Sequence, residues 1–174
     1  MKNFLRLFVF IVFVLLPLSV FSRNNSKNAT IFIDGNPETE GISPAASHVI
    51  EGEVVIIAVV AENMTNLHTY SFKCQFDTQI VHFNGAVAKM SPSSTAFLEK
   101  NNGSIAAFLS FPDTNCVEIA ATLSGKDPTE CVSGDGVIGF LSFVAKRNGN
   151  PKLMLNSARF VTPEGTTIPT EIGK

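Results

Sequence analysis

The stretch Asn66-Leu-His-Thr-Tyr-Ser-Phe-Lys-Cys-Gln-Phe-Asp-Thr-Gln-Ile-Val-His-Phe83 contains a run of strict alternation between apolar and polar residues. Tyr70, Phe72, Cys74 and Phe76 occupy every second position of that run. Successive side chains of a β-strand point to opposite faces of a sheet, so we expect these four to face a core. The polar residues of the run would then point outward: Thr69, Ser71, Lys73 and Gln75. The pattern predicts a strand with one buried face and one face that is free to meet a partner.

Similar short segments recur along the chain, and clusters of Gly, Pro, Asn, Asp or Ser usually separate them. They cover residues 30–33, 54–61, 70–76, 80–87, 104–111, 117–123, 137–145 and 152–160. No long stretch has helical periodicity, although Ser94 to Lys100 would allow one turn. Evenly spaced short strands with such punctuation are typical of sandwiches and jelly rolls. We therefore predict an all-β fold, a jelly-roll β-sandwich of about eight or nine strands.

The segment 137–145 is apolar on both of its expected faces. One row would hold Val137, Gly139, Leu141, Phe143 and Ala145, and the other Ile138, Phe140, Ser142 and Val144. This pattern fits a central strand that is covered on both sides. It also fits a strand whose outer face is an apolar binding surface.

Residues 1–22 have the pattern of a secretory signal peptide. Lys2 and Arg6 precede an apolar run from Leu7 to Leu18, and Val20-Phe21-Ser22 provides a cleavage signal. A permanent membrane anchor is the alternative, but the run is shorter than the ~20 residues that a spanning helix needs. We expect a secreted protein that is extracellular or held at the cell envelope, without a membrane segment after cleavage. Residues 23–29 would form a disordered lead before one domain, 30–172.

Composition narrows the classes of partner. Cleavage leaves about 150 residues, which is enough for one independent core. It also removes two positive charges, which changes the formal net charge from −2 to −4. Nucleic acids are bound by clustered Lys and Arg, and no such cluster occurs here. Nucleic acid is therefore not an expected partner.

Three cysteines in an exported chain invite a pairing hypothesis. Cys116 and Cys131 both lie in the irregular stretch 111–136, and a disulfide between them would close a loop of about 15 residues. Chain entropy would give such a bridge at most about 3 kcal/mol. Cys74 would then be a buried free thiol. The alternative is that all three cysteines are unpaired structural residues.

Catalytic and metal-binding signatures are weak. Side chains with oxygen atoms occupy every second position in two stretches: Asp34, Asn36 and Glu38, and Asp113 and Asn115. Neither stretch has the ligand spacing of a calcium loop, and turn chemistry explains both. The histidines have no zinc-site spacing: His48, His68 and His82. Glu118 and Asp135 would form a carboxylate pair only if the fold brought them together. No nucleophile elbow or phosphate-binding glycine loop occurs. We expect no enzyme, no cofactor and no metal site.

Four segments, in order and spacing, resemble those of a cohesin domain. They are the long strand Gly52–Asn63, Asn66-Leu67 followed by Phe72 and Phe76-Asp77, the strand Gly136–Lys146, and the closing Lys152–Phe160 with Pro163-Glu164-Gly165 and Ile168. The resemblance covers nearly all of residues 30–172. Cohesins are jelly-roll modules that bind dockerins in bacterial polysaccharide-degrading complexes, and they share their fold family with carbohydrate-binding modules.

The resemblance implies that a flat sheet face receives a dockerin-type or other helical protein. On this chain that face would include Thr69, Ser71, Lys73 and Gln75. The best-known cohesin class carries an Asn-x-Asp where this chain has Thr69 and Ser71, and a neutral hydroxyl cannot supply the carboxylate's charge-assisted bond. Scaffold proteins also string several cohesins together, whereas this chain has one such domain.

Direct binding of polysaccharide is the alternative function. Flat polysaccharide sites stack sugars on exposed Trp and Tyr, but this chain has no Trp, and Tyr70 belongs to the inward row. A single sugar held by Asn, Asp and calcium in a loop would remain possible. Four Asn-x-Ser/Thr sequons, at Asn24, Asn28, Asn63 and Asn102, would matter only in a eukaryotic host.

Overall fold

The computed structural model describes residues 28–38, 41–91 and 95–173. The leader expected at 1–22 and residues 23–27 of the expected lead lie outside this part. Helical structure in the described residues consists of two 3-10 turns, and no helix there is long and apolar enough to cross a membrane. The elements are β1 (Ala29–Asp34), β2 (Val54–Leu67), β3 (Thr69–Gln75), β4 (Val81–Val87), η1 (Phe97–Glu99), β5 (Ile105–Pro112), β6 (Cys116–Leu123), η2 (Pro128–Glu130), β7 (Val132–Ala145), β8 (Met154–Val161), β9 (Thr167–Ile168) and β10 (Thr170–Ile172).

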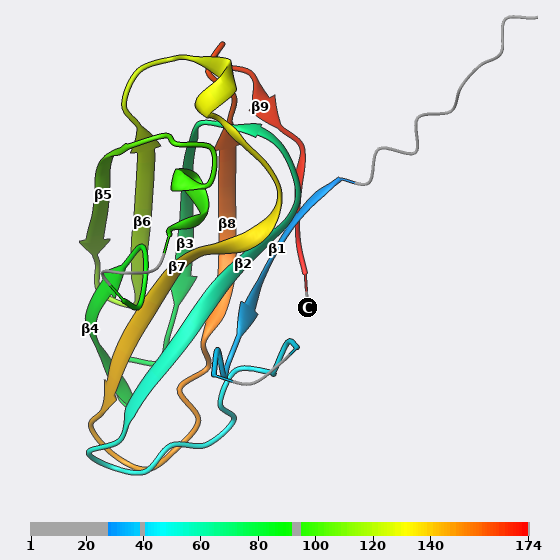
Figure 1. Cartoon of the computed structure of the whole chain (residues 1–174). Helices are drawn as coiled ribbons and strands as arrows, with labels where there is room; N and C mark the ends of the chain where they lie inside the picture. Colours follow the sequence, from blue (N-terminus) through cyan, green and yellow to red (C-terminus); the bar gives the residue numbers. More distant parts are fainter. Residues whose placement is uncertain (1–27, 39–40, 92–94, 174) are drawn as a thin grey trace, which may run out of the picture.

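Two five-stranded sheets stack face to face (Figure 1). One has the order β10-β1-β2-β7-β4 and the other the order β5-β6-β3-β8-β9. This arrangement confirms the all-β sandwich. The structure has ten named strands in the described residues, because the segment after β8 divides at Pro169 into β9 and β10. Before it, β9 pairs with β8, and after it, β10 pairs in parallel with β1 in the opposite sheet.

Strand β3 confirms the alternation from which the fold was predicted. Its burial alternates residue by residue, and Tyr70, Phe72 and Cys74 are at most 2% exposed. The Tyr70 and Phe72 rings stack with their centroids 6.1 Å apart. Phe76, just after the strand, packs against Phe143 of the opposite sheet at 5.3 Å. The inward row of β3 therefore joins the two sheets in one apolar core.

A bulge in β7 interrupts the two rows that the sequence predicted for this strand. Val59 of β2 pairs with Gly139, but Val60 pairs with Val137, so Ile138 is the extra residue. An extra residue in a strand moves each side chain that precedes it to the opposite face of the sheet. Ile138 is consequently buried rather than outward, while Val137 is half-buried. Beyond the bulge, the outer row of Phe140, Ser142 and Val144 is also half-buried.

The proposed disulfide between Cys116 and Cys131 is wrong for this structure, because all three cysteines are free. Cys116 is the first residue of β6 and Leu123 is the last. Glu130, the residue before Cys131, lies against Gly103, and so does Leu123. The two cysteines are thus at opposite ends of an eight-residue strand, roughly 20 Å apart at ~3.3 Å per residue. Disulfides need Cα atoms within about 7 Å of each other. Cys74 is buried as expected, and burial raises the pKa of its thiol to about 12.

Candidate docking face and surface pockets

The structure brings the four predicted contact residues together on the outer side of β3. Thr69, Ser71, Lys73 and Gln75 are all half-buried there, in the middle of their sheet. Their neighbours on β6 are Thr122, Ala120, Glu118 and Cys116, and on β8 they are Val161, Arg159, Ser157 and Met154. We call the outward-facing residues of β5, β6, β3 and β8 the β3 face.

The charges of the β3 face leave a small positive excess. Lys73 and Glu118 lie directly opposite each other, and their Nζ and Oε2 atoms are 3.4 Å apart. Both side chains are exposed, so this pair contributes little to stability, at most about 1 kcal/mol. Arg159, opposite Ser71, makes no ion pair with the described residues. The face therefore presents a cation that has no internal counterion.

Exposed apolar side chains flank this polar centre. Leu109 and Phe111 on β5 are 50% and 53% exposed and pair with Ala120 and Glu118, which places them on the β3 face. Met154, on the opposite side, is 53% exposed and pairs with Gln75. Sequence reasoning did not single out these three residues. The segment 105–112 is apolar almost throughout, so only its pairing with β6 decides which residues point outward.

The hydroxyl of Thr69 is already engaged within the protein. His68 Nε2 lies 2.6 Å from the carbonyl oxygen of Gly125, which can only accept, so Nε2 carries the proton. In a neutral ring Nδ1 is then an acceptor, and Thr69 Oγ1, 2.8 Å away, must donate to it. Thr122 Oγ1 lies 2.8 Å on the other side of Thr69 Oγ1. Thr69 can therefore offer a partner only an acceptor while His68 is neutral.

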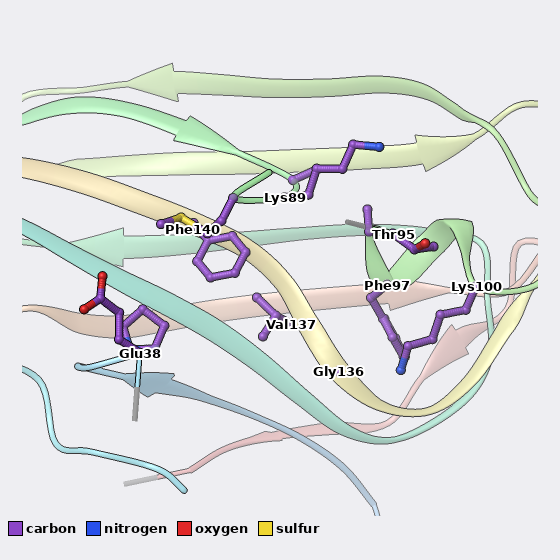
Figure 2. Close-up of a pocket in the computed structure, with 12 residues that line it drawn as sticks. Glu38, Lys89, Thr95, Phe97, Lys100, Gly136, Val137 and Phe140 are labelled. Atoms are coloured by element: carbon purple, nitrogen blue, oxygen red, sulfur yellow. The ribbon is translucent and has the colours of Figure 1, made fainter. Parts of the chain in front are cut away.

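A groove on the opposite sheet is lined mainly by apolar side chains. Two pockets of about 480 and 280 Å³ meet at Met90 and Phe140. Figure 2 shows the larger one, where Phe97 and Lys100 approach from the turn η1 and Phe140 and Val137 from β7. We call this the Phe140 groove. Its outer end includes Ile56 and Val87.

The ionisable groups at the rim of the Phe140 groove do not form a catalytic arrangement. Lys89 Nζ and Glu99 Oε2 are 3.0 Å apart, and this bond, with the Ala96 N–H, holds the pKa of Glu99 below its usual value. The Lys100 ammonium lies 4.7 Å from the centre of the Phe97 ring and donates to the Asp135 carbonyl. These contacts explain both lysines as structural residues: Lys89 pairs with Glu99, and Lys100 covers the Phe97 ring.

Gly136 is the position on which the Phe97 wall of this groove depends. A Cβ atom at Gly136 would lie 2.4 Å from a ring carbon of Phe97, so Gly136→Ala must displace the ring. We expect a loss of about 1 to 2 kcal/mol in the free energy of unfolding, measured by urea denaturation. Gly139→Ala is the matched control on the same strand, since its Cβ would meet Phe108 at an ordinary 3.5 Å. Equal losses for the two variants would contradict the close approach at Gly136.

The other candidate residues do not converge. Asp34 Oδ1 accepts the backbone N–H groups of Asn36 and Ser43 at 3.1 and 3.0 Å, which is turn chemistry. Glu118 and Asp135 lie on different sheets, and Asp135 Oδ1 accepts the Asn63 N–H at 2.8 Å. Within residues 28–173, outside the two short gaps, no three His, Cys, Asp or Glu residues are grouped as metal ligands would be.

Comparison with known proteins gives a clear answer for the fold. No protein-family model matches the sequence, and no curated protein matches it. Solved cohesin structures do match, with low sequence identity. The second type II cohesin module of the adaptor scaffoldin from Acetivibrio cellulolyticus gives a TM-score of 0.61 at 12% identity, covering 84% of this chain and 86% of that one.

Two further cohesins extend the comparison. The sixth cohesin of scaffoldin B from Acetivibrio cellulolyticus, solved in complex with a dockerin, gives a TM-score of 0.60 at 15% identity over 84% of this chain and 94% of that one. A non-cellulosomal cohesin from the hyperthermophilic archaeon Archaeoglobus fulgidus gives 0.56 at 10% identity over 83% and 86%. At sequence identities this low, structural similarity is evidence of the fold alone. The comparisons show that this chain has the cohesin-like β-sandwich fold.

Proposed function

We propose that this protein is a secreted, non-catalytic module that binds a dockerin-type helical protein through its β3 face. The observation that carries the proposal is the make-up of that face. A row of short polar groups around Lys73 lies between exposed apolar side chains on β5 and β8. Several of the similar solved cohesins are complexes with dockerins.

The width of the β3 face favours a pair of helices over a single one. Leu109 and Phe111 on β5 are separated from Met154 on β8 by β6 and β3. Three strand spacings of ~4.8 Å make this separation roughly 14 Å. One helix with its side chains is only ~10 to 12 Å across. A single helix that runs along the strands would therefore leave one apolar border uncovered, whereas two packed helices would cover both.

The polar centre indicates what the partner should carry. Where cohesins of the best-known class offer an Asn and an Asp, this chain has Thr69, which presents an acceptor, and Ser71. Lys73 and Arg159 lie beside these positions. We expect a donor opposite Thr69 and a carboxylate near Lys73 or Arg159. This charge pattern would select against dockerins that present Lys or Arg at that point.

The remaining parts of the proposal rest on the sequence. The basic start and apolar run of residues 1–22 support export, so we propose an extracellular or envelope location, with 30–172 as the binding domain. The described residues supply no converging acid, base or nucleophile in support of catalysis. Polysaccharide as the ligand of the β3 face lacks support, because its exposed side chains include no Tyr or Trp.

Isothermal titration of the purified protein against a panel of dockerins tests the proposal. We expect at least one dockerin with acidic helix surfaces to bind. The variant Lys73→Glu should weaken that binding about tenfold or more, since the new carboxylate and the Glu118 carboxylate, which has then lost its cation, would both repel an acidic partner. Lys146→Glu is the control, because it makes the same change of charge at an exposed residue just after β7 in the other sheet.

Two outcomes would overturn the assignment. If no dockerin binds while soluble glucans do, the carbohydrate alternative replaces it. If a dockerin binds and both charge reversals leave its affinity equal, the contact surface is not the β3 face.

A further inference from the structure

A second pocket, distinct from the Phe140 groove, lies where the last residues of β2 meet the β8–β9 turn and the start of β1. It has a volume of about 400 Å³. In Figure 1 this is the end of the molecule where β9 is labelled. None of the four proposed contact residues of the β3 face lines it. An inference from this pocket is therefore independent of the proposed function.

Most of the residues that line the pocket are neutral and polar, and their carbon atoms form the larger part of its surface together with three apolar residues. Seven of its ten lining residues are Asn or Thr, and none is ionisable, so a charged ligand would find no counterion in the lining. The side chains of Asn63, Thr65, Asn66, Thr166 and Thr167 make no hydrogen bond to the described part of the chain. Five amide or hydroxyl groups thus line one depression with their bonding capacity free for water or a ligand.

The backbone holds the two asparagines in fixed positions. Asn63 and Asn66 have φ angles of 55° and 54°, in the left-handed region, at the irregular end of the pairing between β2 and β7. Their backbone N–H groups donate to Asp135 Oδ1 at 2.8 Å and to Ser133 Oγ at 2.9 Å. Both amide side chains therefore start from an anchored backbone, which lowers the entropic cost of binding.

We propose that this Asn/Thr pocket binds a neutral saccharide of one or two sugar units. A sugar hydroxyl both donates and accepts, and so do the groups that line the pocket, since an amide supplies two donors and an acceptor and a hydroxyl supplies one donor and two acceptor sites. Pro169, which is exposed beside the buried Ile168, provides an apolar contact for the C–H face of a sugar ring. The volume lies within the range of small-molecule sites.

Chemical-shift mapping by NMR, with ¹⁵N-labelled protein and cellobiose or xylobiose as probes, tests this proposal. We expect shifts confined to residues 63–66 and 162–169 that saturate with probe concentration. In the variant Asn66→Gly the affinity should fall about fivefold or more, because the amide is removed while glycine adopts the same φ without strain. Thr166→Val removes one hydroxyl with little change of shape and should have an effect in the same direction.

Asn102→Gly is the matched control for the asparagine variant. Its φ of 62° is equally left-handed, and it lies in the turn after η1, outside the pocket lining. The proposal is overturned if neither disaccharide shifts the pocket resonances, or if Asn66→Gly and Asn102→Gly bind a disaccharide equally well. In the latter case the pocket asparagines serve the backbone geometry alone. A failure of dockerin binding would leave this result unaffected.

Discussion

Replacing Tyr70 with Phe should lower the free energy of unfolding by about 2 to 3 kcal/mol, although it removes a single oxygen atom. Tyr70 is 2% exposed, and its hydroxyl crosses the sandwich to donate to the carbonyl of Ile138. Ile138 is the extra residue of the β7 bulge, so its carbonyl is outside the regular ladder of hydrogen bonds. In the variant Tyr70→Phe this buried carbonyl would lose its partner, which costs more than the bond itself contributes.

The same residue gives a second measurement, because Tyr70 is the only tyrosine and the chain has no tryptophan. Burial raises the pKa of the Tyr70 phenol above its ordinary value of 10. The unfolded chain ionises near pH 10 and the folded chain does not, so the contribution of Tyr70 to stability is present below that pH and is lost as the pH rises further. Phenolate absorbance should therefore appear together with alkaline unfolding. Ionisation in the folded protein near pH 10 would contradict the enclosed hydrogen bond.

Local alternation was sufficient to predict β3, but it was not sufficient for β7. In β3 each residue pairs in step with β6, so the period of two seen in the sequence survives in the structure. In β7 the bulge at Ile138 reverses the facing of Val137, and a bulge depends on the partner strand and on Tyr70 beneath it. Nothing within residues 137–145 distinguishes the two cases, because both rows are apolar.

The candidate sites divide in the same way. The outward row Thr69, Ser71, Lys73 and Gln75 follows from its own strand, whereas Leu109 and Phe111 join it only through the register of β5 with β6. The engagement of Thr69 by His68 and Thr122 depends on contacts across the sheet and with the loop at Gly125. The disulfide hypothesis failed for a related reason, since a straight strand that begins at Cys116 moves Cys131 to the far end of the sheet.

Phe111→Asp should have the largest effect on the proposed partner complex, a loss of affinity of about 100-fold, or about 2.7 kcal/mol. The Phe111 side chain is 53% exposed on β5, so the free protein has little packing to lose. In the complex, the ring would be covered by the partner, and large aromatic residues in such positions dominate binding energies. An aspartate would have to bury its charge against an apolar surface and would also lie opposite Glu118.

Val87→Asp is the matched control, because Val87 is 49% exposed on β4, the strand at the corresponding edge of the other sheet. Titration calorimetry of both variants with the dockerin that binds, together with urea denaturation, separates loss of contact from loss of fold. If the β3 face docks the partner, Phe111→Asp alone weakens binding while both variants keep similar stability. Equal weakening by both, or by Val87→Asp alone, would move the docking surface to the sheet that carries the Phe140 groove, since Val87 lines that groove and Phe111 does not.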